Sequence, residues 1–392
     1  MSVKRHPLHS LCSYLGCFPP RVPAKILKSC IEPGNLVLDP FCGSGTTLLE
    51  AALGGYRAIG FDLNPLAVAI AQAKTQVVSL EFVLDRVREL AREFTPSVDL
   101  ESVPDDVKVI FHPRTLAQLA YLQNALDLTR SEDLFLRGVV LGIMHGKHRK
   151  GGGTSYLSID MPNTFSMSPE YVRKFVKRKK LVQLPVDVFG KLRERVEWLL
   201  RGPALPADMP VRVRSGDATK LDKLLEAERV SQVDAIVTSP PYLGVLRYGA
   251  FNWIRLWFLG FAPSAVDHAL DSTDSLDRYL SFMSNFLTAA GRVVKPGGTV
   301  ALVIGDVVEF GTSLNLAKRV WDEVGSLTPF TLSWIEADRF DEGVKTTRIW
   351  GEDKKGRATP LDRILLLQRA ANVRSKPTVK IGTRATARAR SG

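Results

Sequence analysis

Short apolar runs that end in an acidic residue recur near the start of the chain. Residues 34–39 and 57–62 each have the pattern of a buried strand closing on an aspartate. A loop with two glycines follows the first run, and residues 48–54 have helical spacing. Asn64-Pro65 opens a second helix, because proline suits a first-turn position. This order predicts the beginning of a doubly wound, mostly parallel α/β sheet.

The strand pattern returns in the second half of the chain. Residues 211–214, 233–238, 299–304 and 364–367 are predicted strands, and residues 276–294 are a predicted helix. These elements complete the sheet that the first half begins. The fold class predicted from the whole pattern is α/β, with a helical insertion between the two halves.

Four segments follow from this division of the chain. Residues 1–75 form the first part of the predicted sheet domain and residues 211–370 the second part. Residues 76–210 are mostly helical and charged, and we interpret them as an inserted region that contacts the target. Residues 371–392 contain basic residues and no acid, so we predict a disordered tail.

The chain is strongly basic, with a formal net charge of +12 and a pI of about 9.6. Such a surplus favours polyanionic partners, since cations that neutralise phosphates release counterions. The densest basic runs outside the tail lie in the insertion, and a solvated face remains the alternative to a DNA-binding role. The candidate DNA-binding residues are Lys147, Arg149, Lys150, Arg173, Lys174, Lys177 and Arg178.

Several classes of protein are not expected. No apolar run of about 18 residues predicts a membrane span, and no secretory signal is evident, so we expect a cytoplasmic protein with no membrane partner. The four cysteines do not form CxxC pairs, which disfavours a zinc site. His145 and His148 have no nearby acid, so we expect no metal.

The glycine loop indicates a nucleotide-like cofactor. Gly43 and Gly45 let the backbone approach a ligand closely, although an ordinary tight turn has the same composition. No Lys-Ser/Thr follows at the spacing of a nucleoside triphosphate loop, and Leu48 replaces the third glycine of a dinucleotide loop. Asp62 ends the next strand, where an acid can accept hydrogen bonds from both hydroxyls of a ribose.

A second motif, Ser239-Pro240-Pro241-Tyr242, follows the strand at 233–238. Neither proline can donate an N–H, so this edge offers carbonyl acceptors rather than donors. In open α/β sheets ligands bind at the carboxyl ends of strands. The motif therefore favours a substrate amine, and a simple Pro-Pro turn is the alternative.

The two motifs together, residues 39–47 and 238–242, resemble those of the amino-methylating DNA methyltransferases. This family makes N4-methylcytosine or N6-methyladenine. Further matches are the segment 18–24, Asp62 with Asn64-Pro65, the stretch 215–218 and the turn 295–298. The resemblance implies a class I, Rossmann-like methyltransferase fold and S-adenosylmethionine as cofactor.

The resemblance also implies roles for particular residues. The Ser239 side chain and the Pro240 carbonyl would accept the protons of the target amine, and Tyr242 would stack on a base flipped out of the helix. The implied catalytic residues are Ser239, Pro240, Pro241 and Tyr242. The implied cofactor-binding residues are Phe18, Asp39, Phe41, Gly43, Ser44, Gly45, Thr46, Asp62, Asn64 and Asp217.

The substrate base and the partners stay open at this stage. Serine before Pro240-Pro241 favours cytosine N4 by the family pattern, with adenine N6 as the alternative. An RNA base amine and an inactive nucleic-acid-binding protein are the remaining hypotheses. Cytosine-C5 methylation is excluded because no Pro-Cys dipeptide occurs. The expected partners are DNA and, as one option, a restriction or defence system; no oligomeric state is predicted.

Overall fold

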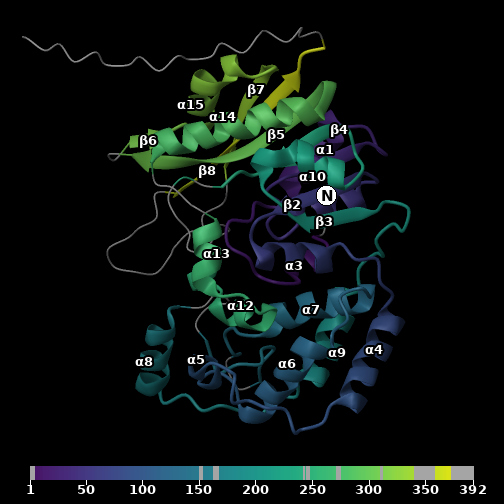
Figure 1. The fold of residues 1–392 in the computed structure, drawn as a ribbon, viewed down its shortest axis with the longest axis vertical. Coiled ribbons are helices and arrows are strands. Elements are labelled where there is room, and N and C mark those ends of the chain that lie inside the picture. The colour runs from purple at the N-terminus through teal and green to yellow at the C-terminus, as the bar shows by residue number, and fades with distance from the viewer. Residues whose placement is uncertain are drawn as a thin grey trace, which may run out of the picture.

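The computed structural model describes residues 5–149, 153–161, 167–241, 243, 248–270, 275–309, 312–339 and 358–371. A mixed sheet with helices on its faces forms one part of the molecule, and a cluster of helices lies on the other side of α3 (Figure 1). None of the described helices is long and apolar enough to cross a membrane.

One sheet contains all the strands that the structure describes. They are β1 (Leu36–Asp39), β2 (Arg57–Asp62), β3 (Val211–Ser215), β4 (Val233–Thr238), β5 (Val294–Glu309), β6 (Thr312–Leu314), β7 (Phe330–Arg339) and β8 (Ala358–Arg369). Their order is β3-β2-β1-β4-β5-β8-β7, and β6 pairs with β5. The strands β1 to β5 pair in parallel, whereas β8 is antiparallel to both β5 and β7. The predicted doubly wound, mostly parallel α/β sheet is confirmed.

Alternation along the strands builds a separate core on each face of the sheet. Leu38 and Ile236 point to the face that helices α10 and α14 cover, and Val37 and Val237 point to the face that α1 and α2 cover. The covering helices are α1 (Arg21–Cys30), α2 (Thr46–Leu53), α10 (Leu221–Ala227), α14 (Leu276–Val293) and α15 (Leu316–Val324), with the short 3-10 turns η2 (Ala218–Lys220) and η3 (Gly325–Leu327). The turn η1 (Pro7–Ser10) packs instead in the core of the helical region.

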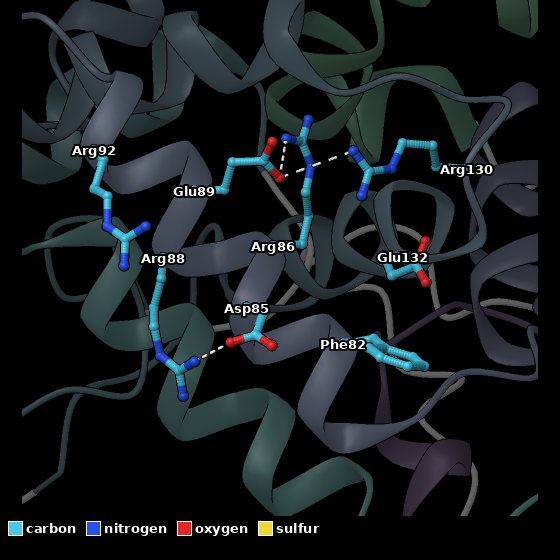
Figure 2. A pocket seen from close by; sticks show the side chains of 8 residues that line it. All are labelled: Phe82, Asp85, Arg86, Arg88, Glu89, Arg92, Arg130 and Glu132. Atoms are coloured by element: carbon cyan, nitrogen blue, oxygen red, sulfur yellow. Dashed lines mark hydrogen bonds and ion pairs between the residues drawn. The ribbon is translucent and has the colours of Figure 1, made fainter.

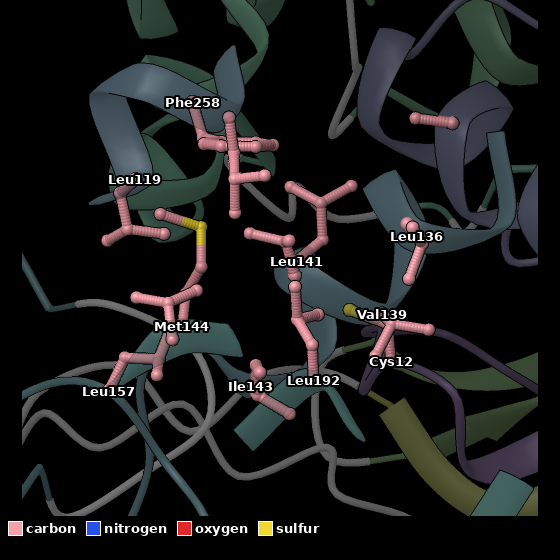
Figure 3. Packing of buried hydrophobic residues seen from close by; sticks show 14 of the residues in the cluster. Cys12, Leu119, Leu136, Val139, Leu141, Ile143, Met144, Leu157, Leu192 and Phe258 are labelled. Atoms are coloured by element: carbon pink, nitrogen blue, oxygen red, sulfur yellow. The ribbon is translucent and has the colours of Figure 1, made fainter. Parts of the chain in front are cut away.

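A helical region follows α3 (Pro65–Lys74) in the chain and precedes β3. Its helices are α4 (Leu80–Glu93), α5 (Asp105–Lys108), α6 (Pro113–Ala125), α7 (Ser131–Ile143), α8 (Pro169–Lys179) and α9 (Val188–Leu199). Three helices follow β4: α11 (Tyr248–Phe251), α12 (Trp253–Leu259) and α13 (Pro263–Ala269). Helix α12 packs against α6, and α11 packs against α12 and α13. Side chains from α6, α7, α9 and α12, among them Leu119, Leu136, Leu192 and Phe258, share one apolar core (Figure 3).

Helix α3 joins the sheet to the helical region. Ala71 belongs to the core beneath the sheet, whereas Ile70 and Ala73 belong to the core of the helical region. A Cβ atom at Gly138 of α7 would lie 2.2 Å from the Cβ of Ala73. The small residues therefore allow the two helices to approach closely, which sets the helical region against the glycine loop.

Two parts of the sheet differ from the expectation. The predicted turn at residues 295–298 lies inside β5, because Val233 pairs with Val294 and Ala235 pairs with Thr299. Gly297 has φ +78°, so these four residues form a bulge within β5. They are not a turn that precedes the strand. The strand β7 was not predicted, because its apolar residues alternate with polar residues and form no continuous apolar run.

Candidate functional site

The predicted cofactor loop lies at the carboxyl ends of the parallel strands. Gly43 and Gly45 have φ +49° and +76°, in the left-handed region that favours glycine. A Cβ at Gly45 would lie 3.0 Å from the Cβ of Ala71, so α3 also excludes a side chain there. The loop thus presents backbone, rather than side chains, at the ends of β1 and β2.

Asp62 fixes this loop against the start of α3. Its Oδ2 accepts a hydrogen bond from the Gly43 amide at 2.8 Å, and its Oδ1 accepts one from the Asn64 amide at 2.8 Å. Asn64 in turn caps α3 by accepting the Leu66 amide at 3.0 Å. Burial raises the pKa of Asp62 to about 6, although these amides lower it. The Leu63 amide is a third donor to this carboxylate, which has about four lone-pair sites and so keeps capacity for a ligand hydroxyl.

A second buried carboxyl group connects the loop to β4. Thr238 Oγ1 donates to Asp39 Oδ1 at 2.5 Å, and burial raises the pKa of Asp39 to about 7. Ser239 Oγ donates to the Val303 carbonyl at 2.9 Å. The end of β4 is therefore held by both of its neighbours, β1 and β5.

The predicted catalytic motif begins at this held end. Ser239 is half-buried, Pro240 is buried and Pro241 is exposed. Because the Ser239 hydroxyl proton is engaged by Val303, its oxygen lone pairs remain available as acceptors. Tyr242 lies outside the described residues.

Asp217 lies at the end of β3, next to Asp62. The Gly216 amide donates to the Asp62 carbonyl at 3.1 Å, which places the two strand ends together. Asp217 caps η2 by accepting the Thr219 amide at 2.9 Å. Burial acts to raise its pKa, but hydrogen bonds from Thr219 and the nearby Lys220 hold the pKa of Asp217 below its usual value.

The other predicted cofactor residues lie in or under the loop. Phe18 is buried in the core that α1 covers, and the Phe41 ring packs edge-on against Phe286 of α14, with centroids 5.0 Å apart. Ser44 and Thr46 are buried, and Ser44 Oγ lies 3.0 Å from Cys17 Sγ. These side chains therefore pack into the interior on both faces of the sheet.

An aromatic pair at the loop was missed from the sequence. The rings of Tyr14 and Tyr248 stack with centroids 5.6 Å apart, and Asn64 Nδ2 donates to the Tyr14 hydroxyl at 2.9 Å. A Cβ at Gly43 would lie 3.6 Å from the Tyr14 ring. The pair therefore covers the loop beside Asp62. Its only sequence signal was proximity: each tyrosine lies within six residues of a motif.

The candidate DNA-binding residues belong to the helical region rather than to the strand ends. Lys147 and Arg149 are exposed, and Lys150 lies outside the described residues. On α8, Arg173 pairs with Asp106 and Lys174 pairs with Glu170. The neighbouring Lys177 and Arg178 are exposed and lie on the same helix, at the outer end of the region (Figure 1).

A depression on α4 and α7 is a weaker candidate. Figure 2 shows its arginines interleaved with acids: Arg86 with Glu89 and Arg88 with Asp85. Arg130 also contacts Glu89, at 3.8 Å. Because the acids offset the arginines, this surface has no marked preference for a phosphate backbone.

Comparisons with known proteins agree with the geometry of the strand ends. The model of the DNA methylase family, the N6/N4 methyltransferases, matches residues 3–73 and 233–358, which is half of the chain. The Type II methyltransferase M.MjaII of Methanocaldococcus jannaschii is 21% identical over 81% of this chain and 74% of its own length.

Two further relatives match smaller parts. The Type II methyltransferase M.MvaI of Kocuria varians is 24% identical over 56% of this chain and 50% of its own length. The tRNA (guanine(10)-N2)-dimethyltransferase of M. jannaschii is 33% identical, but over only 22% of this chain and 26% of its own. The matched segments contain the glycine loop, Asp62 and the Ser239 motif. The chain therefore belongs to the N6/N4 DNA methylase family of S-adenosylmethionine-dependent methyltransferases.

Proposed function

We propose that this methyltransferase transfers a methyl group to the exocyclic amine of a base in DNA. The observation that carries the proposal is the hydrogen bond that the Ser239 hydroxyl donates to the Val303 carbonyl, at 2.9 Å. Because its proton is used in this bond, the hydroxyl oxygen can act only as an acceptor toward a ligand. The Pro240 carbonyl is the second acceptor of the same turn. A pair of acceptors without donors suits an amine, which has protons to give.

The residues act on the amine through hydrogen bonds that are already in place. The lone pair of a base amine is delocalised into the ring, so the amine is a poor nucleophile. Acceptors at Ser239 and Pro240 favour the tetrahedral nitrogen, whose lone pair is localised. Because β4 is held by Asp39 through Thr238, this stabilisation needs little rearrangement during the reaction.

In this proposal S-adenosylmethionine lies across the strand ends in one direction. The sheet order places β3, β2, β1 and β4 side by side. Asp217 at β3 would bind the adenine and Asp62 the ribose, with the glycine loop beneath the amino-acid end. When bound, the cofactor supplies an electrophilic methyl group. Ser239, at the end of β4, would then hold the amine beside it.

The target base is the finer part of the proposal. We favour cytosine N4 over adenine N6 because serine precedes Pro240 in the motif, as in the cytosine-N4 pattern. Both Ser and Asp can accept a hydrogen bond, so this preference rests on the family pattern and not on acceptor chemistry. A base must leave the duplex to reach a turn at the sheet edge, which predicts base flipping.

The test is product identification. The full chain is incubated with isotopically labelled S-adenosylmethionine and, separately, with unmethylated genomic DNA and with total tRNA; nucleosides are then analysed by mass spectrometry. We expect labelled N4-methyldeoxycytidine from DNA. Labelled N6-methyldeoxyadenosine would overturn the preference for cytosine, and label in tRNA alone would overturn DNA as substrate. Failure to bind S-adenosylhomocysteine would indicate an inactive relative.

We expect the exposed basic residues of α8 to contribute measurably to DNA affinity. Replacing Lys177 and Arg178 by serine should weaken binding of duplex DNA about three- to tenfold. The slope of log K against log salt concentration should become shallower by the amount expected for about one to two lost phosphate contacts. The matched control replaces Lys318 and Arg319 on α15, whose charges pair with acids on their own helix. Equal effects of the two double variants would show a general charge effect instead of a contact surface.

The raised pKa of Asp62 predicts a pH dependence of cofactor affinity. A ribose needs the ionised carboxylate as acceptor, and this form is lost as the pH falls through about 6. The affinity for S-adenosylhomocysteine should therefore fall roughly tenfold from pH 7 to pH 5, as measured by calorimetry. The Asp62→Asn variant should bind more weakly and show little change over this range. An unchanged wild-type affinity at pH 5 would contradict the ribose role.

A further inference from the structure

Lys74, the last residue of α3, is buried behind the glycine loop. Its side chain is 1% exposed, and its Nζ donates a hydrogen bond to Ser44 Oγ at 3.2 Å. Ser44 is itself only 4% exposed and lies between Gly43 and Gly45. Within the described part of the chain, no carboxylate forms an ion pair with Lys74. The ammonium thus lies under the cofactor loop with a hydroxyl as its bonded partner.

A buried ammonium without a counter-charge is costly. Burial accordingly lowers the pKa of Lys74 to about 8, so the group is still mostly charged at neutral pH. The titratable groups around it are the thiols of Cys12, Cys17 and Cys42, the Arg5 guanidinium and the His9 ring. Burial raises the pKa of the Cys12 and Cys42 thiols, so these two groups are neutral at pH 7. The Glu50 carboxylate is bonded to the His9 ring at 2.6 Å and forms no ion pair with Lys74 in the described part of the chain.

The missing anion has a natural source at this loop. In the binding mode proposed above, adenine lies at Asp217 and ribose at Asp62, and the methyl group must reach Ser239 at the end of β4, on the far side of β1 in the sheet order. The amino-acid end of S-adenosylmethionine therefore crosses the loop that contains Ser44. This end carries a carboxylate. Helix α2 also has Gly45 as its N-cap residue and so no side-chain cap, which leaves its positive end available for the same anion.

We infer that Lys74 is the counter-charge for the amino-acid carboxylate of the cofactor, acting through Ser44 from behind the loop. It is a positioning residue, because Ser44 separates its ammonium from the ligand. The inference rests on the proposed function only through the use of this cofactor. The charge of Lys74 should therefore raise the affinity for ligands that carry the amino-acid carboxylate. It should not change the affinity for the nucleoside part.

Two ligands separate this role from general support of the loop. S-adenosylhomocysteine has the carboxylate, whereas 5′-methylthioadenosine has the same nucleoside and thioether without the amino-acid group. Calorimetry on the full chain should show that Lys74→Met weakens S-adenosylhomocysteine about ten- to hundredfold and 5′-methylthioadenosine less than twofold. The matched control is Lys191→Met, which removes a partly exposed lysine paired with Glu194. It should change neither affinity.

Each other outcome has a distinct meaning. Equal losses for both ligands, or no loss for either, would overturn the role of Lys74. Failure of the wild-type chain to bind either ligand would instead overturn the proposed function. Ser44→Ala, which removes the connecting hydroxyl, should lose affinity for S-adenosylhomocysteine alone and keeps the test available if Lys74→Met does not fold.

Proton uptake gives a readout that a purely structural lysine would not change. If the carboxylate binds across Ser44 from a half-protonated Lys74, binding of S-adenosylhomocysteine should raise the pKa of Lys74 and take up as much as about half a proton at pH 8. Calorimetry in two buffers of different ionisation enthalpy measures this number. Lys74→Met should take up less by that amount, because the titration of the ligand amine is common to both proteins. Equal uptake in the two proteins would overturn the inference.

Discussion

Replacing Ser239 by alanine is expected to slow methyl transfer by about one to three orders of magnitude, the scale of losing one preorganised group. Binding of DNA and of S-adenosylmethionine should change little. The reason is that the amine needs acceptors for its protons most strongly as its nitrogen becomes tetrahedral. An interaction made mainly in the transition state lowers the rate and spares ground-state binding. Single-turnover kinetics with both substrates saturating measures the step.

A conservative variant controls this experiment. Ser239→Thr keeps a hydroxyl that can donate to the Val303 carbonyl and accept from the amine, so it should retain much of the rate. The Pro240 carbonyl remains in both variants, which is why activity should not vanish. A wild-type rate in the alanine variant would mean that Ser239 is only a turn residue and that another group holds the amine.

The parts of the site that lie in short motifs could be predicted from the sequence. An acid that closes a buried strand is placed at the sheet edge by the strand itself, so the positions of Asp39 and Asp62 follow from the pattern. The glycine loop follows in the same way, because Gly43 and Gly45 have backbone angles that other residues avoid. Local chemistry and strand order determine these features together.

The contacts between distant segments could not be predicted in this way. The Tyr14 and Tyr248 rings stack across more than 230 residues, and Lys74 reaches Ser44 only because α3 packs beneath the loop. A lysine at the end of a helix predicts a solvated charge near the helix carboxyl terminus. Its burial depends on the segment before Phe18 and on α7, whose positions no local pattern gives.

Arg255 is the clearest case of such a residue. It lies in α12, within the apolar run Trp253–Leu259. From the sequence alone, an arginine in a helix is expected on the solvent-exposed side. The structure places it at 1% exposure. Its guanidinium donates to the Leu141 carbonyl at 3.0 Å, to Ser13 Oγ at 2.9 Å and to Asn252 Oδ1 at 3.1 Å. It therefore joins α7, α12 and the segment that contains Tyr14.

The same arginine reaches the aromatic pair from both sides. Arg255 also donates to the Ser13 carbonyl, at 3.1 Å, and Ser13 directly precedes Tyr14. On the other side, Asn252 Nδ2 donates to the Tyr248 carbonyl at 2.8 Å. The two tyrosines are thus positioned by one buried cation, and any loss of Arg255 should affect both the stability of the chain and the cover over the cofactor loop.

Arg255→Met should lower the free energy of unfolding by about 2–4 kcal/mol, because several hydrogen bonds to a charged group are lost and their buried acceptors stay unpaired. The gain from removing a buried cation offsets only part of this cost. Thermal unfolding measures the change, and Arg193→Met, at an exposed site on α9, is the charge-matched control with an expected effect within about 0.5 kcal/mol. At a temperature where both proteins are folded, Arg255→Met should also bind S-adenosylhomocysteine more weakly. A variant more stable than wild type would show that desolvation of the guanidinium outweighs its bonds, and that the segments around Tyr14 and Tyr248 are held by their apolar contacts.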